Sequence, residues 1–161
     1  YLIPVLLALL LYSSWFSIAF QPDRINQQIV VLASIIGVAT GNLITLILNY
    51  YIFRPRPFVE LELQLLFYQP TDSSFPANPS VVGFALAFGL LKWNKFAGFI
   101  GMFLALIWGF SRVYAGVSYT SDIIAGGIIG GLTTLISLIC LRKFDYFPKK
   151  IIKLAKAVYL A

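Results

Sequence analysis

Residues 120–141 read TSDIIAGGIIGGLTTLISLICL, an apolar run whose only charged residue, Asp122, lies near its start. A helix of this length can cross a bilayer, because it rises ~1.5 Å per residue and the hydrocarbon core is ~30 Å thick. Four other apolar runs precede it, at residues 2–19, 29–52, 80–91 and 96–113. The pattern predicts an all-α fold, a polytopic transmembrane bundle of about five helices that forms a single domain over residues 1–161.

The composition supports a membrane protein. Hydrophobic residues make up 60% of the chain and charged residues 11%, and the mean hydropathy is +0.87, which is typical of integral membrane proteins. The run at 80–91 is short for a bilayer, so we expect its helix to begin in the preceding loop or to lie partly inside the bundle. The first run lacks a charged leader and a small-residue cleavage site, so we expect a true span.

The basic residues predict an orientation. With five spans, nine of the twelve basic residues fall on one side of the membrane: Arg24, Lys92, Lys95, Arg142, Lys143, Lys149, Lys150, Lys153 and Lys156. The positive-inside rule makes that side cytoplasmic, and we expect a prokaryotic cytoplasmic membrane. Arg54, Arg56 and Arg112 then lie on the external side, against the usual bias.

The C-terminal segment 147–161 is expected to form a basic amphipathic tail. Lys149, Lys153 and Lys156 share one helical face there, which favours binding to anionic lipid at the cytoplasmic surface. The net charge of +6 is then explained by topology and membrane attraction, and nothing indicates nucleic-acid binding. Cys140 is the single cysteine, so an internal disulfide is excluded.

Glycines at four-residue spacing predict close helix packing. The pairs are Gly37 with Gly41, Gly126 with Gly130, and Gly127 with Gly131. Small residues at this spacing let two helix backbones approach closely. Packing within the bundle is favoured over a homodimer interface.

Three polar clusters are expected to meet at the external ends of the helices. The first runs from Asn49 to Pro57, the second from Ser74 to Pro79, and the third contains Ser111, Arg112, Ser118 and Asp122. Arginines at membrane depth are costly and are usually paired or functional. Because Arg binds phosphate through two parallel hydrogen bonds, the clusters predict an anion site.

The spacing resembles the signature motifs of the type 2 phosphatidic acid phosphatase family, which includes lipid phosphatases, undecaprenyl diphosphatases and vanadium haloperoxidases. The resemblance covers residues 29–141. The family's first motif, a lysine followed after six residues by Arg-Pro, matches Asn49 and Arg56-Pro57. Its second motif, Pro-Ser-Gly-His or Pro-Ser-Asn-His, matches Pro76-Ala77-Asn78-Pro79, with Pro79-Ser80-Val81-Val82 as a rival register. Its third motif, Ser-Arg, five residues, His, three residues and Asp, matches Ser111, Arg112, Ser118 and Asp122.

The resemblance implies a site that has lost its catalytic groups. In the family, the third-motif histidine attacks phosphorus, and the second-motif histidine protonates the leaving oxygen. This chain contains no histidine, so no catalytic position is intact. The degenerate positions are Asn49, Ala77, Pro79 and Ser118. A missing general acid typically costs ~10²- to 10⁴-fold in rate.

The remaining residues are expected to bind rather than to react. Arg56 and Arg112 would hold a phospholipid or polyprenyl phosphate head group, with Arg54 and Asn78 as further contacts and Asp122 and Ser111 in support. No metal or other cofactor is implied. An Arg112–Asp122 ion pair that only joins two helices is the rival interpretation. The alternative function is an active lipid phosphatase that uses Ser118, with Asp122 as a weak base. A structural subunit of a membrane complex is the other non-catalytic role.

Several local features have structural interpretations. Asn78-Pro79 fits an N-cap followed by proline at the first helical position, and Ser118, Thr120 or Ser121 can cap the last helix. Glu60 and Glu62 fit the solvent-facing side of an interfacial segment better than an acid/base pair.

Overall fold

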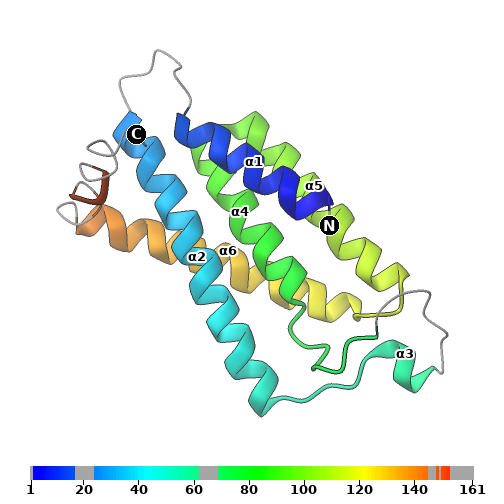
Figure 1. Cartoon of the computed structure of the whole chain (residues 1–161). Helices are drawn as coiled ribbons and strands as arrows, with labels where there is room; N and C mark the ends of the chain where they lie inside the picture. Colours follow the sequence, from blue (N-terminus) through cyan, green and yellow to red (C-terminus); the bar gives the residue numbers. More distant parts are fainter. Residues whose placement is uncertain (1, 17–23, 62–68, 145–147, 149, 153–161) are drawn as a thin grey trace.

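The computed structural model describes residues 2–16, 24–61, 69–144, 148 and 150–152. Its helices are α1 (Leu2–Phe16), α2 (Arg24–Tyr51), α3 (Pro57–Glu60), α4 (Asn78–Trp93), α5 (Lys95–Tyr114) and α6 (Thr120–Lys143). No strand occurs in the described part of the chain, and the five long helices form one bundle (Figure 1). The predicted all-α bundle is confirmed, and each of the five long helices overlaps one expected apolar run.

Among the described residues, three helices are long and apolar enough to cross a membrane by themselves, namely α2, α5 and α6. The helices α1 and α4 are shorter, at 15 and 16 residues. The exposed faces of the long helices carry large apolar side chains, among them Leu46, Phe103 and Ile128. Such faces are suited to lipid, and the chain is an integral membrane protein.

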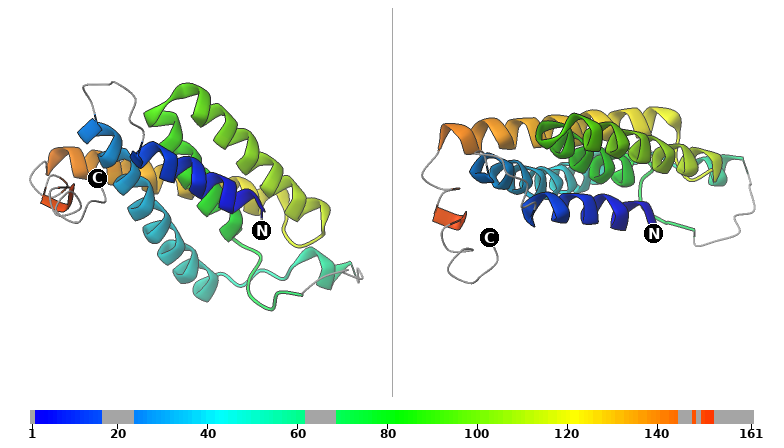
Figure 2. Two further views of the ribbon diagram at one scale, coloured as in Figure 1. Left: turned by 45° about the horizontal axis from the view of Figure 1, so that its top comes forward. Right: turned by 90° about the horizontal axis from the view of Figure 1, so that it is seen from above.

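Helix α4 lies in the centre of the bundle and packs against α1, α2, α5 and α6 (Figures 1 and 2). Its small residues make this possible, because Gly83, Ala85, Ala87 and Gly89 are all buried. Because α4 is surrounded by other helices, it does not need the length of a lipid-exposed helix that crosses the bilayer. The shortest apolar run can therefore form it. The expectation that this run lies inside the bundle is confirmed.

A single residue separates α4 from α5. Asn94 has an extended backbone (φ −143°, ψ 127°), and its side-chain oxygen accepts hydrogen bonds from the amides of Phe96 at 2.8 Å and Ala97 at 3.2 Å. The amide of Asn94 donates to the carbonyl of Leu90 at 2.8 Å. One residue therefore ends α4 and caps α5, so the two helices form a tight antiparallel hairpin.

The glycine pairs pack within the bundle, as predicted. A Cβ atom at Gly130 would lie 2.2 Å from the backbone oxygen of Val81, and one at Gly37 would lie 2.7 Å from the Cα atom of Thr134. The helix α6 thus contacts both α4 and α2 through backbone approaches that only glycine permits.

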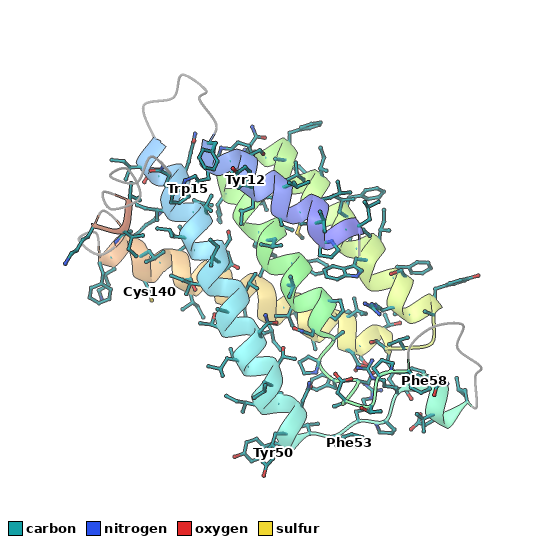
Figure 3. All side chains as sticks on the ribbon, in the orientation of Figure 1. Tyr12, Trp15, Tyr50, Phe53, Phe58 and Cys140 are labelled. Atoms are coloured by element: carbon teal, nitrogen blue, oxygen red, sulfur yellow. The ribbon has the colours of Figure 1, made fainter. Side chains whose placement is uncertain are left out.

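Aromatic residues gather at both ends of the bundle (Figure 3). Tyr12 and Trp15 lie at one end, whereas Tyr50 and Phe53 lie at the other. Tyr12, Tyr50 and Phe53 are exposed, as is typical of side chains at membrane–water interfaces. The second end also carries α3 and the loops of the polar clusters, so it is the end that contains the candidate site.

Two expectations concern segments that are only partly described. Glu60 lies in the one-turn helix α3 and is exposed, whereas Glu62 lies outside the described residues. Most of the tail 147–161 also lies outside them, and of its expected basic face neither Lys149, Lys153 nor Lys156 is described.

Candidate functional site

The three polar clusters meet at one end of the bundle, as the sequence predicted. Backbone hydrogen bonds join the three connecting segments to one another and to α6: Ser74 N to Arg54 O at 3.0 Å, Phe58 N to Gly116 O at 3.0 Å, and Ala77 N to Asp122 O at 3.1 Å. Gly116 has a φ of 67°, a conformation that favours glycine. These bonds hold the loops in a defined arrangement around a pocket.

Asp122 is the centre of a buried polar network. Its side chain is fully buried, and one carboxylate oxygen accepts a hydrogen bond from the Arg54 guanidinium at 2.6 Å. The other oxygen accepts from the Ser74 hydroxyl at 2.5 Å and from the amide of Tyr119 at 3.1 Å. A buried carboxylate needs such partners. The partner that the rival interpretation proposed for Asp122 was Arg112, and that pairing is wrong, because Arg54 occupies the carboxylate instead.

Tyr119 connects the network to α3. The guanidinium of Arg54 lies 4.0 Å from the centre of the Tyr119 ring, within the range of a cation–π contact. The Tyr119 hydroxyl donates a hydrogen bond to the carboxylate of Glu60. This bond raises the pKa of Tyr119 above its ordinary value, because it stabilises the protonated phenol, and desolvation adds to the effect. Glu60 thus has a structural partner.

The N-caps of α4 and α6 lie one or two residues from the predicted positions. The N-cap of α4 is Ala77 and that of α6 is Tyr119, in place of Asn78 and of Ser118, Thr120 or Ser121. At α6 the cap is formed from within the helix, because the Asp122 carboxylate in its first turn accepts the amide of Tyr119. A carboxylate at this position is also favoured by the helix dipole.

Arg56 donates hydrogen bonds to two loops, one at residues 72–73 and one at residue 117. Its Nε donates to the backbone oxygen of Asp72 at 3.0 Å, and one terminal nitrogen donates to the backbone oxygen of Val117 at 2.9 Å. The other terminal nitrogen donates to the Asp72 carboxylate at 2.8 Å and to the backbone oxygen of Ser73 at 3.3 Å. Four of its five N–H donors therefore already have acceptors.

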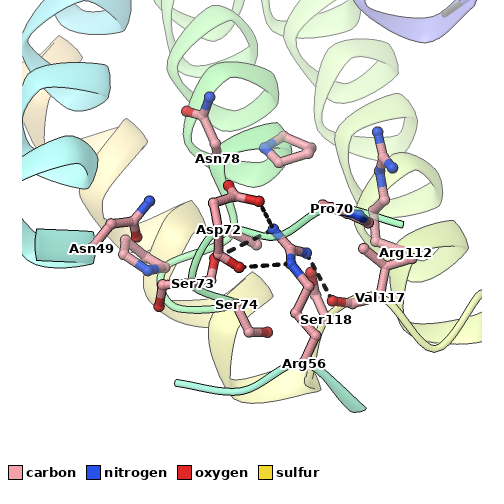
Figure 4. Close-up of a pocket in the computed structure, with 13 residues that line it drawn as sticks. Asn49, Arg56, Pro70, Asp72, Ser73, Ser74, Asn78, Arg112, Val117 and Ser118 are labelled. Carbon is pink, nitrogen blue, oxygen red and sulfur yellow. Dashed lines mark hydrogen bonds and ion pairs between the residues drawn. The ribbon is translucent and has the colours of Figure 1, made fainter. Parts of the chain in front are cut away.

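Arg112 has no such partners. It lies in the last turn of α5, is half-buried, and its guanidinium makes no hydrogen bond or ion pair with any described residue. Figure 4 shows its side chain apart from the hydrogen-bonded group around Arg56. Arg112 is therefore available to bind a ligand.

A pocket of about 310 Å³ lies among the three polar clusters (Figure 4). Its walls are formed by Asn49, Arg56, Pro70, Asp72, Ser73, Ser74, Pro76, Ala77, Asn78, Pro79, Arg112, Val117 and Ser118. Arg56, Arg112 and Asp72 are the charged residues among them. The volume is at the lower end of small-ligand sites, and α4 begins here, so the positive end of its dipole faces the pocket.

The motif positions divide into three groups. The degenerate positions Asn49, Ala77, Pro79 and Ser118 all line the pocket, together with Asn78. Arg54 does not line it, because its guanidinium turns to Asp122. Ser111 is exposed and donates to the backbone oxygen of Trp108 at 2.7 Å, outside the pocket.

All four residues of the preferred register of the second motif, Pro76 to Pro79, line the pocket, whereas Ser80 of the rival register is buried and does not line it. Sequence reasoning placed Ser74 in the second polar cluster without assigning it a partner, and it gave Asp72 no role in the site. Asp72 binds Arg56, and Ser74 binds Asp122. Their position beside a motif was the available signal, but the pairing of each depends on the fold.

Comparisons with known proteins identify the family of this chain. The family model of the PAP2 superfamily matches residues 29–146. The chain is 32% identical over 105 residues to the bacitracin transport permease protein BcrC of Bacillus licheniformis, covering 65% of this chain and 48% of that protein. It is 29% identical over 104 residues to the undecaprenyl-diphosphatase BcrC of Bacillus subtilis, covering 65% and 53%. The chain thus spans about half the length of these relatives.

A solved structure shares the fold. It is a transmembrane PAP2-type phosphatidylglycerolphosphate phosphatase from Bacillus subtilis, with a TM-score of 0.59 and 25% identity, over 88% of this chain and 69% of that one. The family match covers most of the chain, and the helical bundle corresponds to that of a membrane phosphatase. The chain therefore belongs to the PAP2 superfamily.

Proposed function

We propose that this protein binds a lipid phosphate head group in the pocket between Arg56 and Arg112 and does not hydrolyse it. The proposal rests on one observation. The carboxylate of Asp122, which would have to act as the base for Ser118, is already hydrogen-bonded to other groups. Asp122 is fully buried and accepts hydrogen bonds from Arg54, Ser74 and Tyr119. Within the described structure, no hydrogen bond joins Ser118 to Asp122.

The chemistry of the pocket supports binding over turnover. A serine hydroxyl needs a neighbouring base to attack phosphorus, and an ion-paired carboxylate is a poor base. Proline at position 79 has no proton to give to a leaving oxygen. The guanidinium of Arg112, by contrast, is unpaired within the described structure and lies at the end of the bundle that carries the polar loops, where we expect a lipid head group to bind.

Relatives of this chain are named as undecaprenyl-diphosphatases, and a structural relative as a phosphatidylglycerolphosphate phosphatase. A lipid that carries phosphate is therefore the class of ligand that we propose. Hydrolysis through Ser118 is the second candidate, because Ser118 is buried in the wall of the same pocket.

Phosphate release from phosphatidic acid and undecaprenyl diphosphate in detergent distinguishes the two. We expect no release above a protein-free control, and we expect binding of phosphatidic acid to weaken about tenfold in Arg112→Ala, the value of a lost charge-assisted hydrogen bond. Turnover that Ser118→Ala abolishes would refute the proposal in favour of the enzyme.

A further inference from the structure

The end of the bundle opposite the pocket has an excess of positive charge. The three described acidic residues all lie at the pocket end, namely Glu60, Asp72 and Asp122. Five described basic residues at the opposite end have exposed side chains: Lys92, Lys95, Arg142, Lys143 and Lys150. None of the five forms an ion pair with a described residue. The described structure therefore provides no counter-ion at this end.

The chain after α6 folds back onto this end of the bundle. Pro148 is fully buried, and Ile152 is only 3% exposed because it joins the core cluster that contains Ile29 of α2 and Leu141 of α6. The short segment 150–152 lies beside the end of α6 (Figures 1 and 2). Two buried apolar side chains, one on each side of Lys150, thus hold this exposed lysine next to the basic end of α6.

The local sequence keeps the charge positive. Residues 141–152 contain four basic residues and one acidic residue, Asp145, which gives a net charge of +3. One carboxylate cannot balance four cations, wherever its side chain lies. Arg142 is one of the four, and a guanidinium binds phosphate through two parallel hydrogen bonds. This segment is therefore suited to an anionic partner that carries phosphate.

The exposed face of α6 indicates that this partner has a hydrocarbon chain. Four large aliphatic side chains on α6 are each more than half exposed: Ile128, Leu132, Ile136 and Ile139. Their spacing of three or four residues places them on one face of the helix. Lys143 follows Ile139 by four residues, so the apolar stripe ends at the basic residues. A lipid whose chain lies along the stripe would have its head group at Lys143, whereas a soluble anion would leave the stripe unused.

From these observations we infer that the end of α6 and the segment 148–152 form a binding site for an anionic phospholipid, separate from the phosphate pocket at the other end. Arg142, Lys143 and Lys150 bind the head-group phosphate, and the apolar stripe of α6 contacts the acyl chain. Because the site shares no residue with the pocket, the inference does not depend on the proposed function.

The single cysteine allows the site to be measured directly. Cys140 is exposed on α6, two residues before Arg142, so a fluorophore attached to it reports on adjacent lipid. The labelled full chain is reconstituted in phosphatidylcholine vesicles that contain a small fraction of phosphatidylglycerol or phosphatidylcholine with a spin label on the acyl chain, which quenches the fluorophore. We expect the relative binding constant to favour phosphatidylglycerol about tenfold or more, and high salt to reduce this preference.

Two exposed lysines provide a matched pair of variants. Lys150→Gln should lower the preference for phosphatidylglycerol about fivefold, the effect of one basic residue near an anionic surface. Lys95→Gln removes the same charge from the same end of the bundle, but at the start of α5, and should leave the preference unchanged. Arg142→Gln should resemble Lys150→Gln. Arg112→Ala, at the pocket end, should have no effect on this fluorophore.

The site is refuted if the wild type shows no preference for phosphatidylglycerol. Equal effects of Lys150→Gln and Lys95→Gln would also overturn it, because they would reduce the preference to the general positive charge of this end. Replacing chloride with inorganic phosphate at the same ionic strength separates a lipid from a soluble ligand. We expect the quenching to persist, and its loss in phosphate would contradict the assignment of a lipid.

Discussion

At the scale of single residues, the three arginines near the pocket have three different roles. Arg54 neutralises the buried Asp122, Arg56 joins two loops, and Arg112 has no partner within the described structure. Their sequence context is similar, since all three follow the apolar part of a helix. The difference arises from the acceptors that the fold brings to each guanidinium.

The different pairing of Arg54 and Arg112 predicts that their substitutions change the free energy of unfolding by different amounts. Arg54→Ala leaves the fully buried Asp122 without its counter-ion, so we expect unfolding in a detergent titration to become easier by about 1–3 kcal/mol, the usual cost of an unsatisfied buried group. Arg112→Ala is the matched control, with an expected change of about 0.5 kcal/mol or less. Equal effects of the two substitutions would contradict the assignment of Asp122 to Arg54.

At the scale of elements, α6 packs against α4 through two adjacent pairs of glycines. Gly126 and Gly130 approach the backbone of α4, whereas Gly127 and Gly131 lie beneath the rings of Phe84 and Phe88. A backbone cannot move aside for an added methyl group, but an aromatic side chain can shift. The two pairs have the same spacing and differ in what they contact.

Substituting one glycine from each pair tests this distinction. Gly130→Ala places a Cβ atom 2.2 Å from the Val81 carbonyl oxygen, so we expect a loss of about 1–3 kcal/mol from overpacking. Gly127→Ala meets the Phe84 ring at 3.2 Å, and we expect little change, because the better helix propensity of Ala offsets the crowding. Detergent unfolding of both variants provides the comparison, and a stable Gly130→Ala would rule out the close contact between α4 and α6.

At the scale of the whole molecule, the bundle places its polar site at one end and the basic ends of α4 to α6 at the other. Lys92, Lys95, Arg142 and Lys143 lie at helix ends opposite to the pocket. The positive-inside rule then directs the pocket to the external face. The orientation is a prediction that the fold makes testable, because each end offers exposed positions.

Cysteine labelling of intact cells measures the orientation. With Cys140 replaced by Ser, Tyr114→Cys lies in the last turn of α5, at the same end as the pocket, and the position is highly exposed, so a membrane-impermeant maleimide should label it. Lys95→Cys, at the opposite end of α5, should be labelled only after permeabilisation. The reverse pattern would place the pocket in the cytoplasm.

The sequence alone determined that the protein lies in a membrane, the number of its apolar helices, the family motifs and the convergence of the polar clusters. Each of these depends on composition and spacing along the chain. Only the tertiary structure decided that Arg54 neutralises Asp122, that Asp72 forms an ion pair with Arg56, and that Arg112 is unpaired within the described part. These pairings join residues up to 68 positions apart, and their geometry is set by helix packing and loop hydrogen bonds that no local pattern encodes.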